Sequence, residues 1–241
     1  MKALWLIAAV LRYVLLSQRR RWAATLAVGL GLTPLLPAAP SVRVHAMAAL
    51  VAFVVPFVVL GRDASRRRDG FRDALAVSRR AGRLVVLEHV VALAILAPVA
   101  LLWCGAQPGP TLAVLAWGAA VLGVTDALDR RSTHPGAAWA AVASLAFVFY
   151  TAPLWLAPFM GHGFGHWPAT LGIGLHPAAT ALVAGGRTAL QDKVFYTYTL
   201  SGSVDARPLE AGIGTLFHFA LGLLGTGWAV LSARRPARSL S

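Results

Sequence analysis

Long apolar runs, separated by short polar stretches rich in arginine, make up most of this sequence. A helix needs roughly 20 mainly apolar residues to cross the hydrocarbon core of a bilayer. Six runs reach or approach that length: Trp22–Pro37, Val44–Leu60, Leu84–Trp103, Thr111–Thr125, Ala137–Ala157 and Ala211–Ser232. The pattern predicts an all-α, polytopic integral membrane protein with six transmembrane helices, forming a single transmembrane domain over residues 1–241.

Two of these runs, the second and the fourth, are short for a crossing, so their ends should borrow flanking residues or lie where the bilayer is thinned. Prolines interrupt several runs, at Pro34, Pro56, Pro98 and Pro153. Neighbouring helices can satisfy the carbonyls that a proline frees, so these prolines are compatible with spans.

The first residues do not form a simple span. Residues 3–16, "ALWLIAAVLRYVLL", are apolar but too short to cross, and they precede the arginines at 19–21. The pattern favours an interfacial helix with a basic cluster over residues 1–21. A cleaved signal, including a twin-arginine signal in "SQRRRWAATLAVGLGL", is the alternative.

Residues 158–210 also depart from the span pattern. The stretch "ATLGIGLHPAATALVAGG" is apolar but contains four glycines and a proline. Irregular backbone at membrane depth requires shelter by other helices, so we expect a re-entrant hairpin on the outer side of the membrane. The following "QDKVFYTYTLSGSVDARP" is expected to form an outer loop packed on the bundle.

Composition and charge strengthen the membrane prediction and set the orientation. The chain is 58% hydrophobic and only 13% charged, with a net charge of +13. Its arginines punctuate apolar runs instead of gathering on a soluble face, which argues against nucleic acid as a partner. With both termini cytoplasmic, eighteen of the 22 lysines and arginines fall on the inner side, as the positive-inside rule requires.

Two rarer residue types add to this picture. Cys104 is the only cysteine, which excludes an internal disulfide and a multi-cysteine zinc site, and it is expected to be buried or lipid-facing. Many alanines and arginines with only two lysines, Lys2 and Lys193, indicate a GC-rich genome. We therefore expect the protein in a bacterial inner membrane.

The densest charge lies in residues 61–83, between the second and third runs. Asp69 and Gly70 are typical of a helix start, and apolar residues then fall roughly on one side of a short amphipathic helix, with charges on the other. The segment's residues of interest are Asp69, Gly70, Phe71, Arg72, Asp73, Leu75, Val77, Arg79 and Arg80. Its arginines fix topology and contact lipid headgroups, but its mixed charges also favour docking on a partner protein.

This layout resembles the transmembrane subunit of an ABC-2 type transporter, and distantly the haem-exporter permease of cytochrome c maturation. "RRRDGFRDALAVSRRAGRLVVLEHVVAL" is similar to that family's acidic-glycine step, short "LxxLxxSP"-like run and entry into the third span. Here Arg79 stands where the family often has proline. "LHPAATALVAGG" is similar to the family's "NP" element, with His176 in place of asparagine.

The resemblance implies a permease that works as a homodimer or pseudo-dimer and exports an unidentified cargo. Its short loop helix would sit in a groove of a separate ATP-binding subunit. In agreement, the sequence has no G-x-x-x-x-G-K-[ST] motif and no Gly-Lys pair, so we expect no directly bound cofactor and ATP only through the partner.

Histidines offer a different function. His162 and His166 lie four residues apart, and His176 and His218 approach them in the expected topology. Such histidines suit zinc, copper or haem iron, although the glycines of "GHGFGHW" disfavour a rigid helix. A membrane enzyme or metal-handling protein using these outer histidines is therefore an alternative, as is a non-transporting membrane assembly protein.

The remaining ionisable residues predict no catalytic site. Glu88 and His89 open the third run, where Glu88 is expected to pair with Arg83 at the cytoplasmic rim. Asp126 and Asp129 are interpreted as an ordinary charged helix end. Neither G-x-S-x-G nor H-E-x-x-H occurs, and the inverted repeats of a secondary carrier are not visible.

Small residues are expected where helices meet in a membrane. The sequence offers them within the predicted spans at Gly29, Gly31, Gly118 and Gly123.

Overall fold

The computed structural model describes residues 23, 26–36, 39–55, 80–129, 137–160, 171–172, 174–186 and 210–233, with backbone alone for 80–84, 153–160 and 233. The helices are Leu26–Leu35, which ends in the 3₁₀ turn η1 (Thr33–Leu35), α2 (Pro40–Phe53), α5 (Arg80–Trp103), α6 (Pro108–Asp129), α7 (Ala137–Met160), α9 (Pro177–Ala184) and α11 (Ala211–Ala233). No strand occurs among these residues, so the all-α prediction is confirmed for the described part of the chain.

Three of these helices are long and apolar enough to cross a membrane. They cover Val85–Trp103, Pro108–Asp129 and Ala211–Ser232. Leu26–Leu35, Pro40–Phe53 and Ala137–Ala152 are apolar but shorter. The expected membrane character is therefore supported, with three candidate spans within the described residues.

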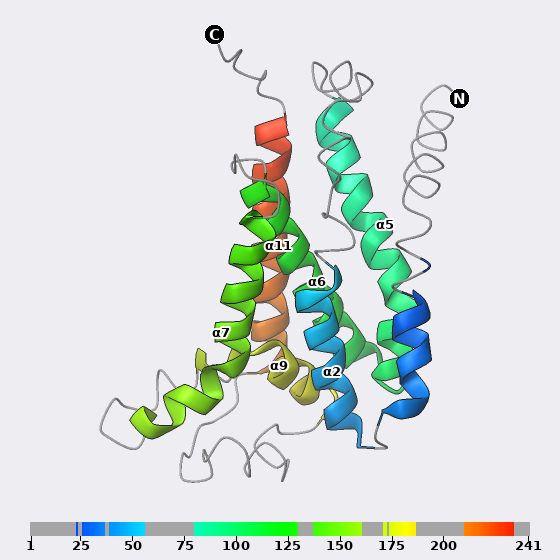
Figure 1. Cartoon of the computed structure of the whole chain (residues 1–241), viewed down its shortest axis with the longest axis vertical. Helices are drawn as coiled ribbons and strands as arrows, with labels where there is room; N and C mark the ends of the chain where they lie inside the picture. The colour runs from blue at the N-terminus through cyan, green and yellow to red at the C-terminus, as the bar shows by residue number, and fades with distance from the viewer. Residues whose placement is uncertain are drawn as a thin grey trace.

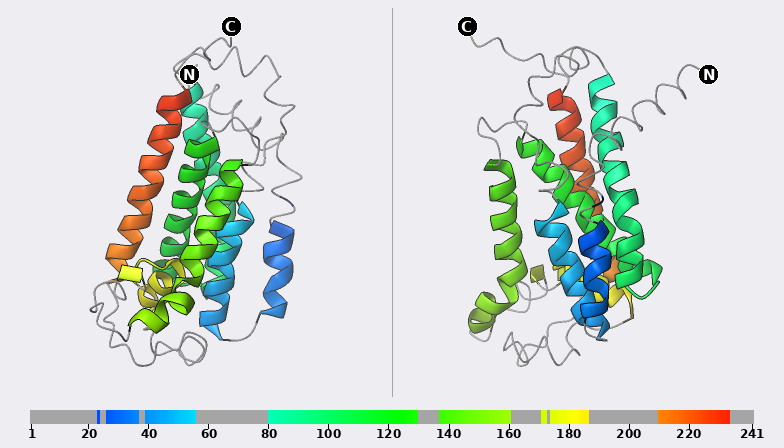
Figure 2. Two further views of the ribbon diagram at one scale, coloured as in Figure 1. Left: turned by 60° about the vertical axis from the view of Figure 1, so that its left-hand side comes forward. Right: turned by 45° about the vertical axis from the view of Figure 1, so that its right-hand side comes forward.

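Successive long helices run in opposite directions. In Figures 1 and 2, α5 and α7 run one way, and α6 and α11 run the other. One end of the bundle consequently holds the start of α5 and the ends of α6 and α11. The opposite end holds α9 and the turn between α5 and α6. We call these the α11-terminal end and the α9 end.

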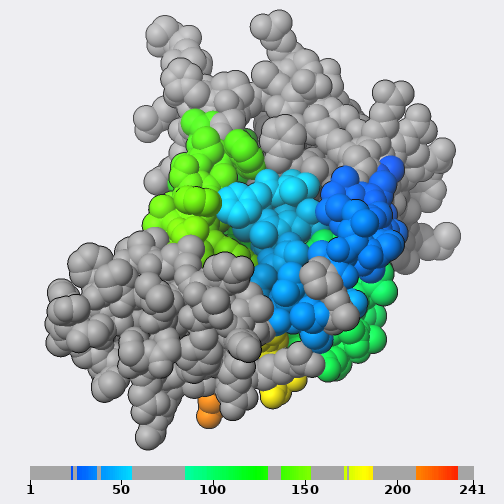
Figure 3. Space-filling model, turned by 60° about the horizontal axis from the view of Figure 1, so that its bottom comes forward, coloured from blue at the N-terminus to red at the C-terminus, as the bar shows by residue number. Residues whose placement is uncertain are grey.

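Helix α6 occupies the centre of the bundle. In the most apolar stretch of α6, 72% is buried inside the bundle, against 39% in the corresponding stretch of α5 and 22% in that of α11. It packs against α2, α5, α7, α9 and α11. Figure 3 shows α2 at the surface, between α7 on one side and residues 26–36 on the other. The fold thus wraps one buried helix with the others.

The outer face of α11 is strongly apolar. The side chains of Leu216, Leu223 and Leu224 are among its exposed large hydrophobic residues, and Leu224 is 72% exposed. Leucines on an outer helix face suit contact with lipid tails, which are as apolar as leucine itself. This face accounts for the low burial of a helix that nevertheless packs closely on α6.

The helix boundaries follow the apolar runs, except that α2 begins at Pro40, four residues before the predicted Val44. α5 ends at Trp103, and α7 and α11 begin at Ala137 and Ala211, as predicted. The short run Thr111–Thr125 was expected to borrow flanking residues, and α6 does so, with 22 residues from Pro108 to Asp129. Its prolines fall in the first turn, where the missing N–H has no helical partner anyway. α5 continues through Pro98, as expected.

Helices α6 and α11 touch backbone to backbone because both carry glycines at their crossing. A Cβ on Gly222 would lie 2.7 Å from the carbonyl carbon of Ala119, and one on Gly225 would lie 2.5 Å from that of Gly123. Only residues without a side chain allow such an approach, which places α11 side chains directly against α6.

Three of the four glycines expected at helix contacts are found there. A Cβ on Gly29 would lie 2.8 Å from Val99 Cγ1, and Gly118 and Gly123 are similarly close to neighbouring helices. Gly31 was predicted wrongly, because nothing lies within 4 Å of its Cβ position. It lies on the exposed side of its helix.

Several predicted segments lie outside the described residues. They are the interfacial helix 1–21, residues 61–79 of the charged segment, His162, His166 and the outer loop 187–209. The structure therefore does not test the predictions for these segments. Cys104, directly after α5, is buried, in agreement with one of its two expected environments.

Candidate functional site

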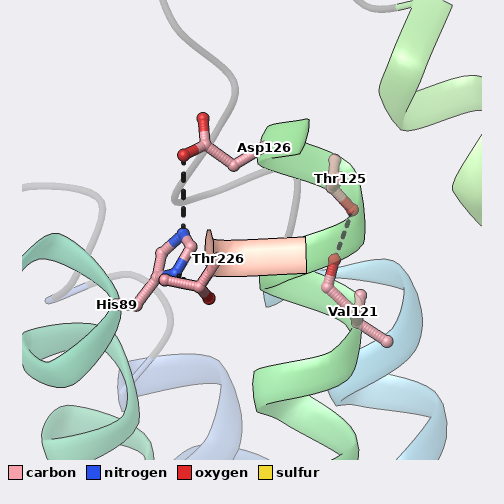
Figure 4. Close-up of polar contacts among 5 residues, drawn as sticks. All are labelled: His89, Val121, Thr125, Asp126 and Thr226. Carbon is pink, nitrogen blue, oxygen red and sulfur yellow. Dashed lines mark hydrogen bonds and ion pairs between the residues drawn. The ribbon is translucent and has the colours of Figure 1, made fainter. Parts of the chain in front are cut away.

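A polar cluster lies where the three candidate spans meet. It consists of His89 from α5, Asp126 from α6 and Thr226 from α11, which point toward one another in Figure 4. We call these three residues the His89 cluster. It lies toward the α11-terminal end of the bundle, since Asp126 is three residues before the end of α6.

The geometry of the cluster joins all three helices. His89 Nδ1 lies 3.0 Å from Thr226 Oγ1, and His89 Nε2 lies 3.7 Å from Asp126 Oδ2. His89 is 6% exposed and Asp126 is 1% exposed. An imidazole and a carboxylate are thus removed from solvent together, with oxygen atoms facing both ring nitrogens.

Close helix packing explains why the three side chains meet. Asp126 is one turn beyond Gly123, and Thr226 follows Gly225, so both polar residues flank the glycine crossing of α6 and α11. A Cβ on Gly123 would lie 3.1 Å from Thr226 Oγ1. The glycines therefore bring the Thr226 hydroxyl within reach of α5.

This arrangement corrects one prediction and sharpens another. Asp126 was interpreted as part of a solvated helix end, which is wrong, because its side chain faces His89 inside the bundle. His89 was assigned as an intramembrane or rim residue, and its side chain, which belongs to α5, is buried in the bundle. Glu88 is half-buried, and its predicted pairing with Arg83 stays a prediction.

A buried ionisable pair between candidate spans is chemically significant. Acids and histidines within membrane segments are rare, face the bundle interior and mark functional sites by default. A buried charge is also costly unless it is paired. The His89 cluster supplies that pairing and adds a hydroxyl that both donates and accepts hydrogen bonds.

A second group of rings lies toward the α9 end. His45 of α2 and Tyr150 of α7 pack beside His176, which precedes α9, and Trp117 of α6 packs on His218 of α11. The His176 ring centroid is 4.7 Å from that of Tyr150 and 6.2 Å from that of His45, and the His218 ring is 5.2 Å from Trp117. We call these five residues the aromatic–histidine cluster.

The histidines of this cluster bind backbone atoms. His176 Nδ1 accepts a hydrogen bond from the Ala179 N–H, while Nε2 faces the Tyr150 carbonyl oxygen at 3.2 Å. His218 Nε2 lies 2.9 Å from the carbonyl oxygen of Leu175. These bonds hold the turn before α9 against α7 and α11.

The metal hypothesis finds no support in the described residues. His176 and His218 do lie in one region, as expected, but no group of three or more histidines, cysteines or acids there has a metal-binding arrangement. Both nitrogens of His176 already face backbone groups. This finding concerns the described residues alone, and His162 and His166 are not among them.

His176 is expected to make stability pH-dependent. Burial, with His45 as the second cause, lowers the pKa of His176 from 6.5 to about 3. Between these values the unfolded chain binds a proton and the folded chain does not. This residue's contribution is therefore full above pH 6.5 and is lost as the pH falls, by at most about 1.4 kcal/mol per pH unit.

A comparison of His176→Asn with His176→Ala tests this prediction. Asparagine also caps helices and does not titrate, so His176→Asn should flatten the fall in melting temperature between pH 7.5 and pH 5. Alanine removes the cap as well and should cost about 1 kcal/mol at every pH. An unchanged pH dependence in His176→Asn would show that another group is responsible.

Comparison of the chain with protein-family models, curated proteins and solved structures finds no match to any of them. The ABC-2 resemblance consequently depends on the residues quoted from the sequence.

Thr226 was missed by sequence reasoning, and Asp126 was misassigned. For Asp126 a signal existed, because the buried positions of α6 include Gly118, Leu122, Thr125 and Asp126. Burial thus continues along α6 as far as the carboxylate, which lies one turn beyond Leu122. For Thr226 no such signal exists, since threonine is ordinary in an apolar helix.

Proposed function

We propose that this chain is the permease subunit of an ABC-2 type exporter. In this proposal six transmembrane helices and a re-entrant outer segment lie in a bacterial inner membrane, with both termini cytoplasmic. A homodimer forms the path, and a separate ATP-binding subunit supplies the energy.

The observation that carries the proposal is the common placement of the helix ends next to basic segments. The start of α5 and the ends of α6 and α11 lie at one end of the bundle (Figure 1). In sequence, each of these ends adjoins arginines: Arg80, Arg130 and Arg234. A single basic end is what the positive-inside rule expects of the cytoplasmic side.

The position of α5 supports the coupling role of the charged segment. Residues 61–79 lead directly into α5, which begins at Arg80. A partner that moves this segment would therefore act on α5, and α5 packs on the central helix α6. The motion would reach the middle of the bundle through a single helix.

Helix α9 supports the re-entrant segment. It has eight residues, too few to cross a bilayer, and its first six residues are buried. It packs against α6, α11 and α2. A short helix sheltered by spans is the form in which non-crossing backbone is tolerated at membrane depth.

The apolar side of the charged segment, residues 61–83, provides the main test of its coupling role. A triple variant, Phe71→Ala, Leu75→Ala and Val77→Ala, keeps every charge. We expect it to reduce stimulation of the partner's ATP hydrolysis about tenfold or more, because apolar anchors dominate docking energy.

A matched control changes three exposed apolar residues of α11, as Ile213→Ala, Leu223→Ala and Leu224→Ala. This control should retain full stimulation, and both variants should elute as the wild type does in size-exclusion chromatography. Full stimulation in the variant of the charged segment would contradict the proposed coupling of the partner subunit to α5.

Co-purification provides an independent test of the partner. The tagged chain, extracted in several mild detergents, should bring a nucleotide-binding subunit with it. His162→Ala and His166→Ala should leave stimulation of the partner's ATP hydrolysis unchanged. Loss of activity in these histidine variants, with no subunit recovered, would favour the metal-handling alternative.

A further inference from the structure

We propose that the His89 cluster is a proton-binding site that links α5, α6 and α11. Its ligand is a single proton, held between the imidazole of His89 and the carboxylate of Asp126. This inference depends on contacts among described residues and does not require the proposed export function.

The placement of oxygen atoms around His89 is the first argument. One ring nitrogen faces the hydroxyl of Thr226 at 3.0 Å, and the other faces the carboxylate of Asp126 at 3.7 Å. A protonated imidazole donates from both nitrogens. Its Nδ1–H would then donate to the Thr226 hydroxyl oxygen, and its Nε2 side would form an ion pair with the Asp126 carboxylate.

The same heavy atoms also accommodate the neutral imidazole. In that state Nε2–H points at Asp126, and Nδ1 accepts a hydrogen bond from the Thr226 hydroxyl. A hydroxyl rotates its hydrogen freely and is donor or acceptor as needed. Thr226 therefore lets His89 gain and lose a proton without moving the helices' backbones.

The second threonine of the region has no such freedom. The Thr125 hydroxyl donates to the carbonyl oxygen of Val121 at 2.6 Å, within its own helix. Figure 4 shows the two threonines in these different arrangements. Thr125 is thus a useful control: it is fully buried, whereas Thr226 is half-buried, and its hydroxyl is engaged within α6.

Protonation changes the charge buried between the helices. Binding the proton raises the net charge of the cluster by one. Because α5, α6 and α11 all supply a member, each protonation event changes the charge at the contact of all three helices.

Few other ionisable groups accompany the cluster on the packed helices. α5 carries Glu88, and α6 carries Asp129 one turn beyond Asp126. The described part of α11 contributes the Thr226 hydroxyl to the cluster. The histidine of α11, His218, instead faces the Leu175 carbonyl oxygen toward the α9 end. Arg43 and His45 of α2 also lie toward the α9 end.

The first experiment observes the proton directly. The full chain, labelled with ¹⁵N-histidine, is titrated from pH 5 to 8.5 in detergent, and the His89 ring signals are assigned by their loss in His89→Gln. We expect these signals to titrate, and their midpoint to move by at least about half a pH unit in Asp126→Asn. Ring signals that stay constant in the wild type would overturn the proposal.

The second experiment separates proton binding from simple packing. Thr226→Val removes the hydroxyl that serves both states, so it should shift the His89 midpoint. Thr125→Val removes one backbone bond and should leave it unchanged. Equal midpoints in the wild type and Thr226→Val would contradict the role of Thr226, even if Asp126→Asn does not fold.

Both experiments use the permease chain without a partner subunit. Failure of the proton site would therefore leave the export proposal standing, and failure of co-purification would leave the proton site standing.

Discussion

Replacing Gly225 with leucine is expected to separate α11 from α6 and to prevent the chain from folding stably. A Cβ at this position would lie 2.5 Å from the carbonyl carbon of Gly123 and 2.7 Å from the backbone nitrogen of Val124. Backbone atoms of a central helix cannot rotate away as a side chain does. We expect a cost of at least about 3 kcal/mol, the upper end for over-packing.

The measurement is thermal unfolding in detergent, with the elution profile as a check of assembly. Gly227→Leu is the matched control, because nothing lies within 4 Å of a Cβ on Gly227 in the same helix. It adds the same bulk two residues away and should leave the melting temperature nearly unchanged. Equal stability of the two variants would mean that the backbone contact of α6 and α11 is not essential.

Replacing Trp103 with alanine should release the helix Leu26–Leu35 from the bundle. The Trp103 side chain is buried at the end of α5, and its Nε1–H group faces the carbonyl oxygen of Gly29 at 3.0 Å and Thr33 Oγ1 at 2.9 Å. Removing a buried tryptophan side chain typically costs about 3–5 kcal/mol.

Hydrogen exchange read by mass spectrometry localises the effect. Amides of residues 26–35 should exchange faster in Trp103→Ala, while those of α6 keep their protection. Trp103→Phe fills most of the space but removes both of these hydrogen bonds, while the Gly29 carbonyl keeps its bond from the Thr33 hydroxyl, so we expect a smaller loss, about 1–3 kcal/mol. Unchanged exchange of residues 26–35 in both variants would show that other contacts hold this helix.

The helices could be predicted because run length is a property of the sequence alone. Trp103, Ala137 and Ala211 mark helix ends that agree with the apolar runs. The apolar run of α6 ends before Asp126, although the helix itself continues to Asp129. A carboxylate ends an apolar run in a sequence, but in the structure a partner on another helix keeps it inside.

The partners themselves could not be predicted. His89 and Thr226 are 137 residues apart in the sequence, and only the packing of α11 on α6 brings them together. The glycines show the same limit, since Gly29 and Gly31 look equivalent in sequence but only Gly29 faces α5. Spacing identifies candidate contact residues, whereas the partner helix decides which of them are used.

The central position of α6 has a consequence for biosynthesis. Its glycine face is covered by α11, the last described helix of the chain, so a nascent polypeptide would hold that face open until the ribosome has passed residue 233. The earlier helices would remain in the translocon or the lipid without α11 packed on α6. A chain truncated before Ala211 should accordingly be recognised as incomplete and degraded by membrane quality control.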